Sequence, residues 1–290
     1  MTKEEFSTLT QSIMLLDGAT GSNLMAMGMP RGICTETWVM DHKDIILNLQ
    51  RAYVEAGSRI IYAPTFGGNR LSLRQHGLED RIREINLTLV SYAKEAAGNK
   101  AYVAGDITTT GKFISADGEY TYDMAFETYC EQIRLLSEAG VDCIIAETMI
   151  SIDETLAAVD AAQTVCSLPI LCTMTVEADG SIFSGGNAME ASVALESAGA
   201  SAVGINCSVG PDQLVSVVRS IKECVSVPVI AKPNAGMPVI DDKGNAVYSM
   251  GPSEFARHMK ALTENGASVI GGCCGTTPDF IRETAQLLHL

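Results

Sequence analysis

Eight short apolar runs, each followed by a segment with helical periodicity, constrain the fold of this chain more than any other feature. The first run, 13–16, precedes residues 44–56, where Ile45, Leu49 and Tyr53 recur at helical spacing. The other runs are 59–63, 101–106, 142–147, 169–174, 201–207, 227–232 and 268–272. Continuous apolar runs of this kind are typical of strands that are buried on both faces of a parallel sheet.

The segments between these runs complete a repeating strand–helix pattern. They are 81–97, 123–139, 153–165, 189–198, 211–224, 253–265 and 279–288. Eight such units in 290 residues predict an α/β fold, a closed (β/α)8 or TIM barrel. An open doubly wound sheet is the alternative, but no phosphate-binding glycine pattern follows the first run. Because no linker divides the chain, one barrel domain is expected over residues 1–290.

The charge balance and the cysteine usage exclude several classes of partner. With 20 basic and 35 acidic residues the formal charge is −15, and no basic cluster offsets it, which argues against nucleic acid and anionic membranes. Residues 1–12 are polar and acidic, and no apolar run approaches the roughly 18 residues of a membrane span. The nine cysteines form no spaced framework, so we expect reduced thiols and a cytoplasmic protein.

Three cysteines stand at the ends of two predicted strands. Cys273 and Cys274 lie in a glycine-flanked turn after the last run, and Cys207 ends the sixth run. Only the seventh strand separates these two strands, so all three thiols can reach one ion at a Zn–S distance of about 2.3 Å. Three thiolates with a fourth position open are typical of catalytic zinc. The alternative for the Gly-Gly-Cys-Cys-Gly turn is a tight turn or a phosphate-binding loop.

The other cysteines on helices and strands are interpreted as small buried hydrophobic residues. They are Cys130, Cys143, Cys166, Cys172 and Cys224.

Polar residues follow several other runs, where a barrel carries its active site. Asp17, Asp106 and Glu147 are such residues. Asp17 and Glu147 together would place two carboxylates beside the metal, which suits a substrate with an ammonium group. As alternatives, Asp17 caps its own loop and Glu147 interacts with a helix dipole. Asn234 is either a turn residue or a fourth metal ligand in the absence of substrate.

Four motifs carry a resemblance to a known family. They are Asp17–Gly21, Gly204–Ser208, Pro233–Gly236 and Gly271–Thr276. In these motifs the chain resembles the homocysteine S-methyltransferase family, and within it the homocysteine-binding barrel of cobalamin-dependent methionine synthase. The resemblance implies that Cys207, Cys273 and Cys274 bind Zn²⁺. It also implies that Asp17 and Glu147 hold the amino group of homocysteine and that backbone amides near Gly18 hold its carboxylate. Asn206, in the second motif, is counted among the substrate-binding residues.

The activity implied by the resemblance is methylation of a zinc-bound homocysteine thiolate to methionine. Two loops, Ala63–Pro64 and Thr108–Thr110, depart from the usual family pattern. Because a single barrel accounts for the whole length, we expect the methyl donor to be supplied separately. A corrinoid (methylcobalamin) on a separate protein is the expected donor, with the two altered loops at the docking rim.

Three other functions are compatible with parts of the sequence. One is methyl transfer to another thiol within a corrinoid-dependent system. A Schiff-base lyase would use Lys232, at the end of the seventh run, with Gly271–Gly272 as its phosphate site. A non-catalytic zinc-binding or thiol-sensing protein would have four protein ligands around its metal.

Overall fold

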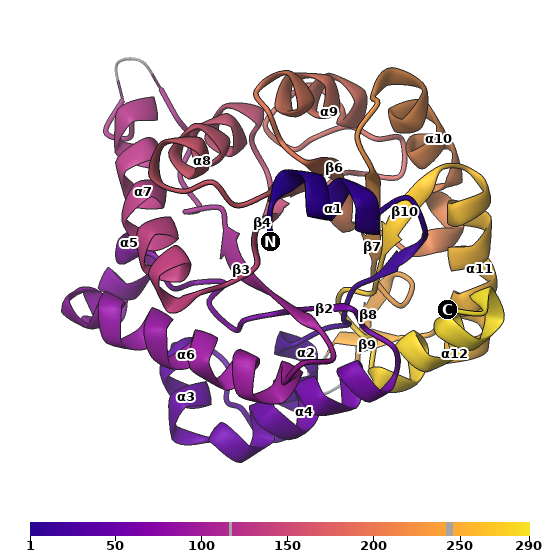
Figure 1. Ribbon diagram of the computed structural model, residues 1–290, viewed down its shortest axis with the longest axis horizontal. Coiled ribbons are helices and arrows are strands. Elements are labelled where there is room, and N and C mark those ends of the chain that lie inside the picture. Colours follow the sequence, from indigo (N-terminus) through magenta and orange to yellow (C-terminus); the bar gives the residue numbers. More distant parts are fainter. Residues whose placement is uncertain (116–117, 242–245) are drawn as a thin grey trace.

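The computed structural model describes residues 1–115, 118–241 and 246–290, and it confirms the predicted (β/α)8 barrel. The order of neighbouring strands is β1-β10-β7-β6-β5-β4-β3-β2, all pairs are parallel, and a bridge between Leu16 and Ile60 joins the two ends (Figure 1). The strands are β1 (Met14–Leu15), β2 (Ile60–Tyr62), β3 (Tyr102–Thr108), β4 (Cys143–Met149), β5 (Ile170–Met174), β6 (Ala202–Cys207), β7 (Val229–Pro233) and β10 (Ala267–Ile270).

Helices surround the barrel and bury one face each against it. They are α4 (Lys43–Glu55), α6 (Ile82–Ala97), α7 (Tyr122–Ala139), α8 (Ile152–Val165), α9 (Ala188–Ser197), α10 (Val215–Cys224), α11 (Pro252–Glu264) and α12 (Pro278–Leu288). The first and last residues of most of these helices lie within two residues of the predicted bounds. The exception is α10, because Pro211–Gln213 forms a separate 3₁₀ turn, η2, before it.

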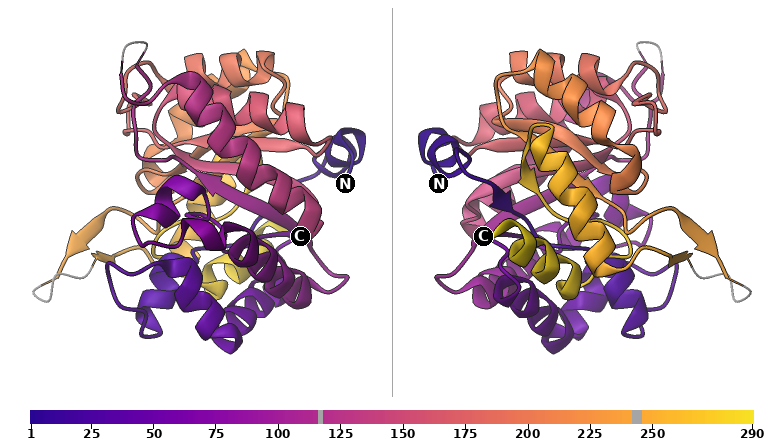
Figure 2. Two further views of the ribbon diagram at one scale, coloured as in Figure 1. Left: turned by 90° about the vertical axis from the view of Figure 1, so that its left-hand side faces the viewer. Right: turned by 90° about the vertical axis from the view of Figure 1, so that its right-hand side faces the viewer.

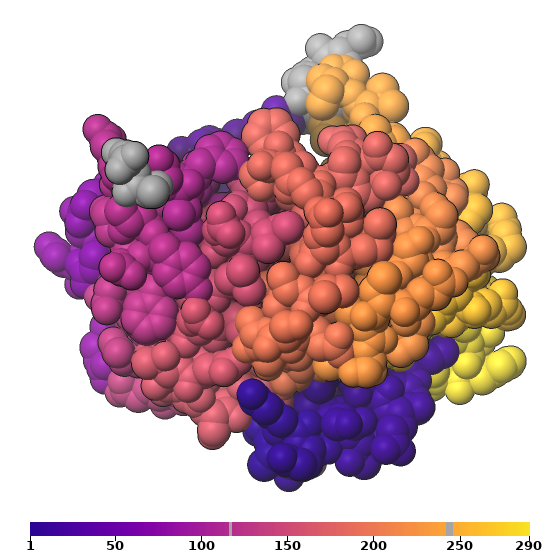
Figure 3. All heavy atoms as spheres, turned by 90° about the horizontal axis from the view of Figure 1, so that it is seen from above, coloured from indigo at the N-terminus to yellow at the C-terminus, as the bar shows by residue number. Residues whose placement is uncertain are grey.

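Several short elements were not predicted from the sequence. They are α1 (Lys3–Leu9), α2 (Gly21–Ala26), α3 (Thr35–Asp41), α5 (Arg70–Arg74), η1 (Glu79–Arg81), β8 (Pro238–Ile240) and β9 (Ala246–Tyr248). Helix α1 covers the amino-terminal end of the barrel (Figure 1), where Phe6 packs with Met14, Leu16 and Ile60. The antiparallel β8–β9 hairpin projects from the body of the molecule (Figure 2) and lies at the end opposite α1 (Figure 3).

The strand side chains that point into the barrel form an apolar plug. They include Leu16, Ile60, Ala104, Ile145, Leu171, Ala202, Ile230 and Val269. Side chains alternate along a strand, so the inward residue after Ala104 is Asp106, after Ile145 it is Glu147, and after Ile230 it is Lys232. A polar layer therefore covers the carboxyl end of an apolar interior.

Close packing between two strands of the barrel requires a glycine at position 204. A Cβ atom at Gly204 would lie 2.0 Å from the Ile230 carbonyl oxygen, so β6 can pair with β7 at this register only without a side chain there. This packing brings Cys207 opposite Pro233. None of the helices in the described part of the chain has the length and apolar character needed to cross a membrane.

Candidate metal centre and binding pocket

Three thiols meet at the carboxyl end of the barrel, as the strand ends predicted. The Sγ atoms of Cys207, Cys273 and Cys274 all lie within 4.8 Å of one another, and those of Cys207 and Cys274 are 3.8 Å apart. Four tetrahedral bonds of about 2.3 Å place two ligand sulfurs roughly 3.8 Å apart, so the spacing fits zinc. It is far longer than the S–S bond of about 2.05 Å in a disulfide.

All nine cysteines of the chain lie in described ranges and are free. Cys130, Cys143 and Cys172 are fully buried, as expected. The interpretation of Cys224 as a buried residue was wrong, because it lies at the exposed end of α10.

The backbone at Cys207 is held in an uncommon conformation. Cys207 and Ser208 have φ values of 59° and 53°, in the left-handed region that costs a non-glycine residue about 1–2 kcal/mol. Asn234 supports both residues, because its backbone N–H donates to the Cys207 carbonyl (3.3 Å) and its Nδ2 donates to the Ser208 carbonyl (3.0 Å). The Cys273 amide donates to the Pro233 carbonyl at 2.7 Å. Strand β7 thus fixes the thiols on both sides of it.

The thiols form one electrostatic unit. Hydrogen bonds from Cys207 and Cys273 lower the pKa of Cys274 to about 3, whereas hydrogen bonding to Cys273 and Cys274 raises the pKa of Cys207. A Tyr248 hydrogen bond also lowers the pKa of Cys274. Further deprotonation would bring like charges together, which a divalent cation offsets. The buried Asn234 Oδ1 has no hydrogen-bond partner among the described residues, so an acceptor is available beside the thiols.

Asn206 connects the thiols with the neighbouring strands. Its Oδ1 accepts hydrogen bonds from the Thr148 amide (2.7 Å) and the Thr173 hydroxyl (2.8 Å). Its Nδ2 donates to Thr148 Oγ1 at 2.8 Å and lies 3.5 Å from Glu147 Oε2 and 3.9 Å from Cys273 Sγ. The amide therefore positions groups around the site, and its contact with substrate stays a prediction.

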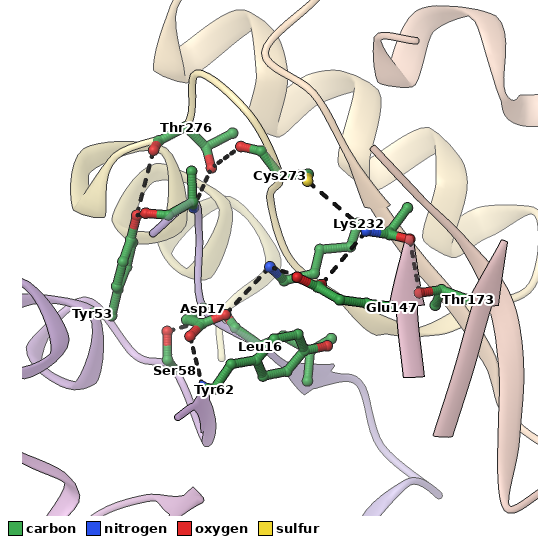
Figure 4. Close-up of polar contacts among 12 residues, drawn as sticks. Leu16, Asp17, Tyr53, Ser58, Tyr62, Glu147, Thr173, Lys232, Cys273 and Thr276 are labelled. Atoms are coloured by element: carbon green, nitrogen blue, oxygen red, sulfur yellow. Dashed lines mark hydrogen bonds and ion pairs between the residues drawn. The ribbon is translucent and has the colours of Figure 1, made fainter. Parts of the chain in front are cut away.

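Lys232 is enclosed by the predicted acidic residues. Its Nζ lies 3.4 Å from Asp17 Oδ1, 3.9 Å from Glu147 Oε2 and 4.5 Å from the centre of the Tyr62 ring (Figure 4). Lys232 is 3% exposed and Asp17 only 1%. The second carboxylate oxygen of Asp17 accepts a 2.8 Å hydrogen bond from the Tyr62 amide. The protein itself therefore supplies one cation to this acidic layer.

Burial and charge shift the pKa values of this group. Burial raises the pKa of Asp17, although Lys232 opposes the shift, and it raises the pKa of Glu147 to about 8. Burial disfavours the Lys232 ammonium, but Glu147 and Asp17 outweigh it and raise the pKa of Lys232. A Schiff base requires a neutral amine, so the ion-paired state of Lys232 argues against the lyase alternative.

A cavity of about 1120 Å³ opens above this polar layer. Its walls carry all three thiols together with Gly18, Asp106, Glu147 and Lys232, but not Asp17. Gly18 is packed closely, since a Cβ atom there would lie 2.7 Å from the Tyr53 hydroxyl. Met25, Met29, Phe66 and His76 also line the cavity.

The two loops expected at the docking rim differ in position. Pro64 lies on the cavity wall. Thr108 and Thr110 are buried, and Glu154 accepts hydrogen bonds from Thr109 Oγ1 (2.6 Å) and the Thr110 amide (2.8 Å), so this loop is anchored to α8.

Sequence reasoning missed some residues around the cavity. Tyr62 could have been found from the alternation of side chains along its strand, and Thr148 from its position directly after Glu147. Tyr248 belongs to the unpredicted hairpin and gave no signal in the sequence.

The fold and the cysteine cluster define a (β/α)8-barrel protein with a three-thiol centre of the kind that binds a metal. Residues 14–288 match the profile of the homocysteine S-methyltransferase family, and the chain belongs to that family. The resemblance inferred from the four motifs is thereby confirmed.

Two curated relatives are methionine synthases. The chain is 31% identical over 296 residues to that of Mycobacterium leprae (strain TN), covering 96% of this chain and 24% of the relative. It is 32% identical over 295 residues to that of Mycobacterium tuberculosis (strain ATCC 25618 / H37Rv), covering 96% and 25%. The chain thus spans about a quarter of the length of these relatives.

Solved structures support the same fold. The homocysteine methyltransferase MmuM from Escherichia coli, in its oxidized form, superposes with a TM-score of 0.80 at 19% identity, covering 97% of this chain and 98% of that chain. The metallated form of MmuM gives a TM-score of 0.79 at 19% identity, covering 98% and 99%.

Proposed function

We propose that this chain transfers a methyl group to the thiol of homocysteine and thereby forms methionine. Family membership supports homocysteine as the acceptor. The observation that carries the proposal is the convergence of three free thiols at the wall of the cavity, with 3.8 Å between the Cys207 and Cys274 sulfurs.

Cys207, Cys273 and Cys274 are the proposed zinc ligands, and Asn234 Oδ1 is the proposed fourth ligand in the absence of substrate. When bound, Zn²⁺ lowers the pKa of a substrate thiol and leaves the sulfur nucleophilic. The protein groups then orient the acceptor: Glu147 faces the cavity beside the thiols, and Asp17 adds negative charge from behind Lys232. These two carboxylates are the proposed attraction for the substrate ammonium, and the Gly18 loop is the proposed carboxylate site.

The proposed methyl donor is a corrinoid presented by a separate protein at the cavity mouth. The resemblance of the four sequence motifs to cobalamin-dependent methionine synthase supports a donor of this class. The cavity volume of about 1120 Å³ supports it too, because homocysteine would fill only a small part of the space and leave the thiols open to a second reactant.

A donor screen tests this proposal. The purified chain, loaded with zinc, is offered homocysteine together with S-methylmethionine, S-adenosylmethionine, betaine or free methylcobalamin, and methionine is measured. We expect slow turnover with methylcobalamin and none with the first three donors. Turnover at ordinary enzyme rates of about 1–10³ per second with any of those three would refute the corrinoid donor. Replacing homocysteine by other thiols tests the acceptor, and a faster reaction with another thiol would refute homocysteine.

A further inference from the structure

Asp106, near the carboxyl end of β3, carries a buried carboxyl group with one oxygen that the described part of the protein does not hydrogen-bond. It is 5% exposed and lies on the cavity wall. Its backbone N–H donates to Thr65 Oγ1, but its Oδ1 has no hydrogen-bond partner among the described residues. The hydroxyl of Tyr62, also on the wall, is likewise buried without a described partner. A buried polar atom left in this state is costly, so a ligand group at this place would be favoured.

The charges around Asp106 indicate the kind of group that is missing. Three carboxyl groups, those of Asp17, Asp106 and Glu147, gather in the polar layer around one cation, Lys232. Lys232 approaches Asp17 most closely, at 3.4 Å, and Asp17 does not reach the cavity wall. Burial and the neighbouring Glu147 raise the pKa of Asp106 well above its ordinary value, and the charge of Lys232 opposes this shift only in part. A second cation would balance this layer from the cavity side.

The strand register places Asp106 beside Glu147. Strands β3 and β4 pair with Asp106 opposite Ile145 and Thr108 opposite Glu147, so Asp106 and Glu147 are inward-facing residues two positions apart on adjacent strands. Both line the same cavity as the three thiols. A small molecule with its sulfur at the thiols and an ammonium group between Asp106 and Glu147 would satisfy both ends of the site.

We propose that Asp106 is a further substrate-binding residue, which together with Glu147 directly contacts the ammonium group of the acceptor. Asp17 then acts as a positioning residue that holds Lys232 and, through its bond to the Tyr62 amide, the end of β2. This inference rests on the proposed function, because it concerns an amino-acid thiol bound at the same centre.

Calorimetric titration of the zinc-loaded chain tests the inference without depending on turnover. Homocysteine is compared with 4-mercaptobutanoate, which lacks only the amino group. Asp106→Asn should weaken homocysteine binding about ten- to a hundredfold, the usual effect of losing one charge-assisted hydrogen bond, and should leave 4-mercaptobutanoate binding unchanged. Asp44→Asn, which removes a charge from the exposed first turn of α4, is the matched control and should change neither affinity.

The outcomes separate this inference from the proposed function. Wild-type affinity of Asp106→Asn for homocysteine, or an equal loss for both thiols, would overturn the role of Asp106 while leaving the function intact. Absence of homocysteine binding to the wild-type chain would overturn both. If Asp106→Asn does not fold, judged by thermal unfolding, Asp106→Ser replaces it with the same expected loss of preference for the amino thiol. A preference that persists in that variant would equally refute the contact.

Discussion

At the scale of single residues, the site depends on groups whose charges cannot be balanced by their neighbours alone. Three thiols lie within 4.8 Å of one another, and three carboxyl groups act on the single lysine beside them. We therefore expect the thiols to bind a metal ion and the carboxyl groups to bind an ammonium group. Substitution of single cysteines tests the metal ligands, and the pH dependence of stability tests the ionisation of Glu147.

The metal ligands are tested by substituting the cysteines. Cys207→Ser and Cys274→Ser should each lose the one zinc ion per chain that we expect in the wild type, because a neutral hydroxyl is a poor replacement for a soft thiolate ligand. Cys224→Ser, on the exposed end of α10, is the matched control and should keep its zinc. Metal analysis after dialysis gives the answer, and full occupancy in both site variants would disprove the assignment.

The buried Glu147 should make the stability of the metal-free protein depend on pH. Its pKa is raised from 4.5 to about 8, so the folded chain retains a proton that the unfolded chain releases at lower pH. Unfolding then releases a proton between these two values, and the free energy of unfolding falls as the pH rises through that window.

Glu147→Gln replaces the buried ionisable carboxyl group and so removes this loss of stability at high pH. Its melting temperature should therefore exceed that of the wild type by more at about pH 9 than at about pH 5. Thermal unfolding of both proteins across this range provides the measurement. Parallel curves for the two proteins would show that Glu147 ionises normally in the folded state.

At the scale of elements, the β8–β9 hairpin contacts the candidate metal centre although it lies outside the barrel. Tyr248 of β9 hydrogen-bonds to Cys274 and packs over Gly275. A Cβ atom at Gly275 would lie 2.3 Å from Tyr248 Cγ, and its φ of +82° is in the left-handed region. The absence of a side chain at this glycine thus allows the hairpin to approach the thiols.

Gly275→Ala should displace Tyr248 and weaken zinc binding about tenfold or more, as loss of a partner that orients a ligand typically does. It should also lower the melting temperature. Gly77→Ala separates the two causes, because Gly77 also has a positive φ, +67°, but has open space where a Cβ would be. That control should lose about 1 kcal/mol of stability and no metal affinity. Equal zinc affinity in Gly275→Ala and the wild type would mean that the hairpin does not support the centre.

At the scale of the whole molecule, the thiol cluster joins strands that lie far apart in the sequence. Cys207 ends β6, Cys273 and Cys274 follow β10, and β7 runs between them. A metal held by all three would be bound by the folded barrel and not by the unfolded chain. Binding therefore adds directly to the free energy of unfolding.

Zinc in hundredfold excess over its dissociation constant should stabilise the barrel by about 2.7 kcal/mol and raise its melting temperature by several degrees. Cys274→Ser, measured at the same zinc concentration, should show no such increase. An equal increase in the variant would place the ion elsewhere on this acidic protein. Differential scanning calorimetry with and without a chelator distinguishes the two results.

The sequence alone determined the barrel and the three thiols. Both follow from local patterns: apolar runs specify strands buried on two faces, and the residue after each run must lie at one common mouth. Cys207, Cys273 and Cys274 are therefore placed by chain position alone. The four family motifs contain the same residues, which is why pattern and family led to one site.

Only the tertiary structure decided how the polar layer is paired. Lys232 contacts Asp17, which is more than 200 positions away, and Asp106 Oδ1 keeps no hydrogen-bond partner in the described part of the chain. No local pattern encodes that choice, because it depends on which side chains from different strands reach one another across the barrel. The same reason applies to Phe6 of α1 and Tyr248 of the hairpin, whose roles arise from surfaces that remote strands provide.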